Sequence, residues 1–156
     1  MHRTGHYGVA LAVYAPIGAV VSAAGFESLA VAGGVVAVGG AMTPDLDLRV
    51  PGISHRGITH TVWFALAAGV LLGIAGYAVD SVAAGVVGAL AGVVLVGAHL
   101  LADALTPMGI RPFAPINGRE YSLDVTTASN PVANYTLLAA GVLVAVGTLV
   151  LVRGGA

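Results

Sequence analysis

Long apolar runs, almost free of charged side chains, dominate this 156-residue sequence. Hydrophobic residues make up 58% of the chain and charged residues only 8%, against about 25% charged residues in an average soluble domain. A transmembrane helix needs roughly 20 apolar residues. The runs cover about residues 7–24, 26–42, 58–80, 81–105 and 132–152. The second is marginal in length, so we expect it to be tilted or partly re-entrant.

The backbone of each run restricts the fold further. In hydrocarbon every peptide group must be hydrogen-bonded within the protein, which leaves helices and closed barrels. The runs lack the alternation of barrel strands, and their Gly and Ala allow close helix packing. We therefore predict an all-α, polytopic membrane bundle with about five transmembrane helices, in one domain over residues 1–156. The first run is read as a retained helix, with a removable signal peptide as the alternative.

Alternate crossings would place residues 1–6, 43–57 and 105–131 at one end of the bundle, which we call the site face. All five His lie on or near it, and the Pro- and Gly-containing segment 105–131 would cover it as a loop or lid. Five of the six Arg also lie there, and Arg153 lies opposite. The positive-inside rule then makes the site face cytoplasmic, in a multi-pass protein of the inner or plasma membrane.

The stretch PDLDLRVPGISHRGITHT, residues 44–61, concentrates ionisable side chains in this apolar chain. Charged groups near a bilayer are costly, so such a cluster indicates function. Its His and Asp, in a chain without Cys, are ligands that suit zinc or another first-row metal. Of Asp45 and Asp47, we expect one to bind metal and the other to orient a His or a water.

A second group of candidate ligands lies at the end of the fourth run. His99 and Asp103 are four residues apart, so they project from the same side of a helix. His60 is expected in the first turn of the third run, and His55 in the loop before it. Together with Asp45, these residues predict a metal site at one membrane face.

Four motifs resemble the YdjM-like family of membrane-bound, metal-dependent hydrolases: TGHYG, PDLD, HRGITHT and HLLADALTPMG. Their order is also similar to that of the zinc-dependent phospholipase C and single-strand nuclease superfamily. The resemblance implies that five residues bind metal: His6, Asp45, His60, His99 and Asp103. The chain lacks a second, later HxxxD, so one or two zinc ions fit better than three, and manganese is also compatible. Thr61 stands where we expect Ser.

The resemblance implies hydrolysis by a metal-activated water, most readily of a phosphoester. Asp47 or His55 would act as base or orient a ligand, and Arg56 would hold a phosphate. Arg111 and Arg119 are further candidates for phosphate contact. A site at the headgroup level suits a lipid phosphoester, so the expected partners are the bilayer and such a substrate.

A metal-ion or proton transporter that uses the same His and Asp is the alternative function. A transporter places its ionisable groups near the bilayer midplane, whereas His60, His99 and Asp103 lie at the ends of runs. This position favours the hydrolase. The net charge of −1 gives no basic field that would attract nucleic acid.

Overall fold

The computed structural model describes residues 1–52 and 54–154; Ile53 of the charged stretch and residues 155–156 lie outside this description. All the named secondary-structure elements of the described residues are helices, and the one pairing of extended backbone among them is an isolated antiparallel bridge between Ile110 and Tyr121. Its elements are α1 (Arg3–Ala23), α2 (Glu27–Gly39), the short 3-10 helices η1 (Pro44–Arg49) and η2 (Ile58–His60), α3 (Val62–Val79), α4 (Val82–Ala104) and α5 (Pro131–Gly154).

Four helices, α1, α3, α4 and α5, are long and apolar enough to cross a membrane. The prediction of an all-helical membrane bundle is confirmed. The second apolar run forms a shorter helix than predicted, because α2 ends at Gly39 and the chain turns before η1. Its 13 residues extend about 20 Å, less than the roughly 30 Å of a hydrocarbon core.

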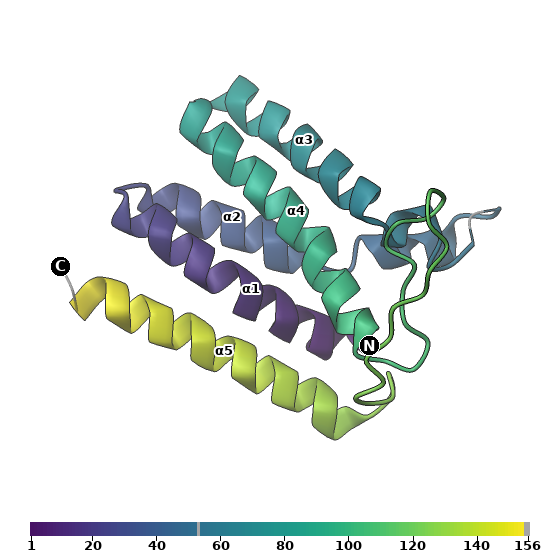
Figure 1. Cartoon of the computed structure of the whole chain (residues 1–156). Coiled ribbons are helices and arrows are strands. Elements are labelled where there is room, and N and C mark those ends of the chain that lie inside the picture. Colours follow the sequence, from purple (N-terminus) through teal and green to yellow (C-terminus); the bar gives the residue numbers. More distant parts are fainter. Residues whose placement is uncertain (53, 155–156) are drawn as a thin grey trace.

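Helix α4 lies in the middle of the bundle and is the most buried of the long helices (Figure 1). Helix α3 packs along it, while α1 and α2 cover another side, and α5 packs on α1. The seam between α1 and α5 is close because Gly8 and Gly141 face each other there. A Cβ added to Gly8 would meet the backbone of Leu137, and one added to Gly141 would meet the backbone of Gly8.

One end of this bundle gathers the segments of the site face. The start of α1, the start of α3 and the end of α4 lie there together with η1 and η2, and the C-terminus lies at the other end (Figure 1). Thr61 caps α3 by accepting a hydrogen bond from the amide of Phe64, which fixes where that helix begins. Thr61 therefore serves as a helix cap here.

The segment 105–131 is hydrogen-bonded across this end of the bundle. The amides of Leu123 and Val125 donate to the carbonyls of Ala104 and Leu105, so they satisfy groups that the end of α4 leaves free. The amide of Val62 donates to the carbonyl of Pro112, which joins the same segment to the start of α3. The segment thus holds the ends of α3 and α4 beside each other.

Candidate metal centre

Four side chains from three different elements meet at the site face. They are Asp45 of η1, His60 of η2, and His99 and Asp103 of the last turns of α4. One ligand atom from each lies within 4.8 Å of the others. The two His and Asp103 are buried, and the side chain of Asp45 is 21% exposed. These four residues, which we call the four-residue cluster, could hold a metal ion.

The distances within the four-residue cluster are short and similar. The two Nε2 atoms of His60 and His99 are 3.1 Å apart. Oδ1 of Asp45 lies 3.4 Å from each of them, and Oδ2 of Asp103 lies 3.7 Å from His60 and 3.5 Å from His99. A tetrahedral zinc with bonds of about 2.0–2.1 Å has ligand atoms about 3.3 Å apart. The cluster therefore has the size that such a site requires.

The position of the proton on the His99 imidazole supports the same conclusion. Nδ1 of His99 lies 2.8 Å from the carbonyl oxygen of Ala41, which only accepts, so Nδ1 is the donor. A neutral His99 then presents the lone pair of Nε2 to the cluster. Two ring nitrogens and two carboxylates this close require positive charge between them, from extra protons or from a metal cation.

Asp47 faces the other side of the His60 ring. Its Oδ2 accepts hydrogen bonds from the hydroxyl of Thr59 at 2.8 Å and the amide of Arg56 at 3.2 Å. Its Oδ1 lies 2.9 Å from Nδ1 of His55, whose side chain is 36% exposed. Asp47, His55 and His60 form a second group that could hold a metal. The hydrogen bonds that Asp47 already accepts favour an orienting role for this carboxylate.

Contacts with neighbouring side chains lower the pKa of both carboxylates of PDLD. Burial by itself raises the pKa of Asp45, but its contacts with His60 and His99 outweigh that effect and hold the pKa well below its usual range. Burial also acts against the charge of Asp47, whose hydrogen bonds with His55 and Thr59 lower its pKa instead. Both groups are therefore anionic at neutral pH and available to a cation.

His6 of α1 reaches the site but is not one of the four clustered residues. Its ring stacks on that of His99, with centroids 3.9 Å apart and planes 7° from parallel. Its Nε2 lies 3.6 Å from Oδ1 of Asp103, and neither ring nitrogen has a hydrogen-bond partner among the described residues, although His6 is only 1% exposed. A buried imidazole whose nitrogens have no partner in residues 1–52 and 54–154 is free to bind a further ligand.

The family to which the chain belongs follows from comparison with known proteins. The family model described as YdjM inner membrane protein matches residues 1–154. The chain belongs to the YdjM inner membrane protein family. No curated protein and no solved structure matches it. The predicted resemblance to this family is confirmed, while kinship with the phospholipase C and nuclease superfamily stays a prediction.

In this YdjM family protein the three predicted phosphate-binding arginines are placed differently. Arg56 reaches into the site, with Nη2 at 3.3 Å from Oδ1 of Asp103 and Nη1 donating to the carbonyl of Gly109. Arg111 is exposed and pairs with Glu120 at 3.2 Å. Arg119 is also exposed and lies over the ring of Tyr121. Of the three, Arg56 is the one that the fold brings to the four-residue cluster.

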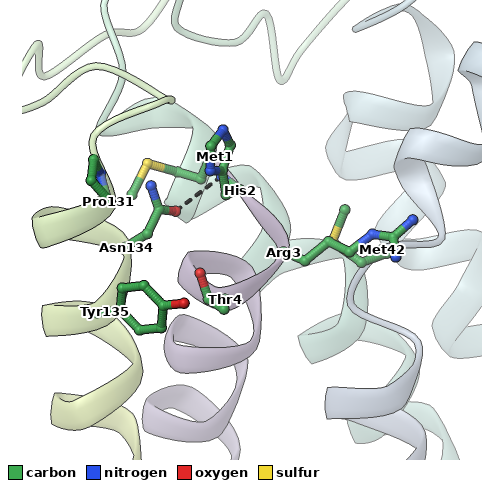
Figure 2. Close-up of a pocket in the computed structure, with 8 residues that line it drawn as sticks. All are labelled: Met1, His2, Arg3, Thr4, Met42, Pro131, Asn134 and Tyr135. Carbon is green, nitrogen blue, oxygen red and sulfur yellow. Dashed lines mark hydrogen bonds between the residues drawn. The ribbon is translucent and has the colours of Figure 1, made fainter.

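A hollow of about 570 Å³ opens beside the site, between the first turns of α1 and α5 (Figure 2). Met1, Met42 and Tyr135 give it a mostly apolar lining, Arg3 adds a positive charge, and no acidic residue lines it in the part of the chain that the structure describes. The amino nitrogen of Met1 lies 2.7 Å from Oδ1 of Asp103. The hollow therefore adjoins the four-residue cluster.

Two partners of the site imidazoles were absent from the sequence prediction. They are the hydroxyl of Thr59 and the carbonyl oxygen of Ala41. Thr59 lies directly before His60 within HRGITHT, which was the one available signal for it. The contact of His99 with the carbonyl oxygen of Ala41 could not be predicted from the sequence, because every residue has a backbone carbonyl.

Proposed function

We propose that this YdjM family protein is a membrane-bound hydrolase that uses a divalent metal, most simply zinc, to cleave a phosphoester. The observation that carries the proposal is the meeting of two imidazole nitrogens and two carboxylates at 3.1–3.7 Å, the spacing of zinc ligands. Asp45, His60, His99 and Asp103 would hold the ion. A bound metal supplies Lewis acidity, which activates water for attack on phosphorus.

The residues around the cluster supply the other parts of such a reaction. Arg56 has a guanidinium group beside Asp103, where it can neutralise a phosphate oxygen. His55 is half-exposed and held by the anionic Asp47, an arrangement that suits a base which takes a proton from water. Both ring nitrogens of His6 lack a partner within the described part of the chain, and its Nε2 lies 3.6 Å from Asp103, so His6 can bind a second ion or the substrate.

A lipid phosphoester is the substrate class that these surroundings favour. The hollow beside the site combines an apolar lining with Arg3, so it suits an apolar chain next to an anionic headgroup. The proposed location is the inner membrane, with multiple crossings and a cytoplasmic site face. The placement of the cluster at the ends of helices favours catalysis at the membrane surface over a transport path through its middle.

The test begins with metal content. The protein, purified in detergent without chelator, should contain about one zinc per chain by elemental analysis. His60→Ala removes one of four ligands and should weaken metal binding by more than the roughly 100-fold typical of an outer-sphere change. His2→Ala is the matched control, because His2 is an exposed His outside the cluster. A folded wild-type protein that binds no divalent metal contradicts the proposal.

Activity is measured on two phosphoesters, a long-chain phospholipid in mixed micelles and a water-soluble phosphodiester. The metal-loaded protein should hydrolyse the phospholipid faster, and His60→Ala should hydrolyse neither. Metal-driven flux into proteoliposomes, without hydrolysis of either compound, would assign the cluster to transport instead.

A further inference from the structure

Thr59 lies between the anionic Asp47 and the ring of His60. It belongs to η2 and precedes His60 directly. Its hydroxyl oxygen is 2.8 Å from Oδ2 of Asp47 and 3.0 Å from Nδ1 of His60. The direct distance from Asp47 Oδ2 to the same ring nitrogen is 3.5 Å, too long for a good hydrogen bond. The hydroxyl is therefore the connection between the carboxylate and the ring.

The direction of these hydrogen bonds follows from counting hydrogens. A hydroxyl has one hydrogen to donate, and its oxygen can accept others. An ionised Asp47 only accepts, so the hydrogen of Thr59 goes to Asp47. The oxygen of Thr59 must then accept the hydrogen on Nδ1 of His60. A neutral His60 is left with an unprotonated Nε2, which is the nitrogen that faces His99 and Asp45.

We propose that Thr59 is a positioning residue that selects the tautomer of His60 and so prepares Nε2 of that ring to bind the metal. This inference rests on the proposed metal centre. It adds a relay of Asp47, Thr59 and His60 to the usual pairing of a carboxylate with a ligand imidazole. The metal-facing nitrogen is thereby supplied as a lone pair before the ion arrives.

The two imidazoles of the four-residue cluster are held by different means. His99 donates to the backbone carbonyl of Ala41, which no side-chain substitution removes. His60 depends on a side-chain hydroxyl. A change at Thr59 should therefore alter one ligand of the metal while the other keeps its tautomer, and this makes the relay separately testable.

The experiment compares three variants with the wild-type protein in detergent. Thr59→Val keeps the shape of the side chain and removes the hydroxyl, while Thr59→Ser keeps the hydroxyl. Thr148→Val makes the same chemical change in α5, where the hydroxyl of Thr148 donates to the carbonyls of Val144 and Ala145. The zinc dissociation constant is measured by competition with a chelator, and nitrogen-15 NMR of labelled His gives the tautomer of His60 in the metal-free protein.

We expect Thr59→Val to weaken zinc binding by about 10–100-fold, the range for outer-sphere partners of ligand imidazoles. Thr59→Ser should restore binding to near the wild-type level, and Thr148→Val should leave it unchanged. In the NMR spectrum, Nδ1 of His60 should carry hydrogen in the wild-type protein and in Thr59→Ser. The two tautomers of His60 should be mixed in Thr59→Val.

The outcomes separate this inference from the proposed function. If the wild-type protein binds no divalent metal, the metal centre itself is refuted. If the wild-type protein binds zinc and a folded Thr59→Val binds it equally well with an unchanged tautomer, the role of Thr59 alone is refuted. Should Thr59→Val fail to fold, Thr59→Ala removes the same hydroxyl in a smaller side chain and is subject to the same criteria.

Discussion

At the scale of single residues, Arg56 combines an unusual backbone with a central position. Its φ is 59°, in the left-handed region that residues other than Gly rarely occupy and that is enriched at functional sites. This conformation lets the amide of Arg56 donate to Asp47 while the guanidinium reaches Asp103. One residue thus contacts both Asp47 and a carboxylate of the four-residue cluster.

Arg56→Gln should separate substrate binding from metal binding. It removes a cation beside Asp103, so zinc affinity should stay the same or increase, since one competing positive charge is gone. Hydrolysis of a phosphoester should fall at least about tenfold in kcat/KM, because a charge-assisted contact contributes about 1.5–3 kcal/mol. Arg49→Gln, a change of an exposed Arg in η1, is the control. Loss of metal together with activity would assign Arg56 a structural role.

At the scale of elements, the seam between α1 and α5 holds the first turn of α1 in place. Gly8 and Gly141 allow the two backbones to touch. Two turns nearer the site face, Asn134 of α5 accepts a hydrogen bond from the amide of His2 at 2.9 Å (Figure 2). His6 lies between these two contacts on α1, so the seam determines how that imidazole meets His99.

Gly8→Val should therefore weaken both the bundle and the site. The added side chain meets the backbone of Leu137, which cannot move aside as a flexible side chain would. Overpacking of this kind costs about 1–3 kcal/mol, and the apparent Tm in detergent should fall by several degrees. Gly147→Val, in α5 where an added Cβ meets nothing within 4 Å, should leave Tm unchanged. Equal Tm values for both variants would show that the seam is not close-packed.

At the scale of the whole molecule, the distribution of Arg predicts orientation. Arg3, Arg49, Arg56, Arg111 and Arg119 lie at the site face, and Arg153 lies at the opposite end, so the site face should be cytoplasmic. The fold makes this prediction testable. The segment 105–131 and the first turn of α2 lie at opposite ends of the bundle, so they should be on opposite sides of the membrane (Figure 1).

Cysteine labelling tests that orientation directly, because the natural chain has no Cys. Gly118→Cys places a thiol in the exposed part of segment 105–131, and Glu27→Cys places one in the exposed first turn of α2. A membrane-impermeant maleimide should label Glu27→Cys in cells whose inner membrane is intact, and Gly118→Cys only after permeabilisation. The reverse pattern would place the site face outside the cell membrane. Labelling of both variants from the same side would contradict the placement of segment 105–131 and the first turn of α2 on opposite sides of the membrane.

The sequence by itself determined the class of the fold and which His and Asp residues gather at one end of it. Hydropathy is a local property of each run, so a helical membrane bundle could be predicted without knowing how the runs pack. Alternation of the runs brought His60, His99 and Asp103 to one end, and the spacing of the last two placed them on one side of α4. The length of α2 was less certain, because apolar residues continue beyond the helix into the turn that precedes η1.

Only the tertiary structure decided which atoms of these residues face one another. It placed Asp45 and Asp47 on opposite sides of the His60 ring, added Thr59 to the site, and left His6 stacked on His99 outside the four-residue cluster. It also paired Arg111 with Glu120, away from the cluster. Such relations depend on rotamers and on contacts of about 3 Å between elements distant in the chain. Sequence spacing cannot determine them, because they arise only when α4 packs between its neighbours.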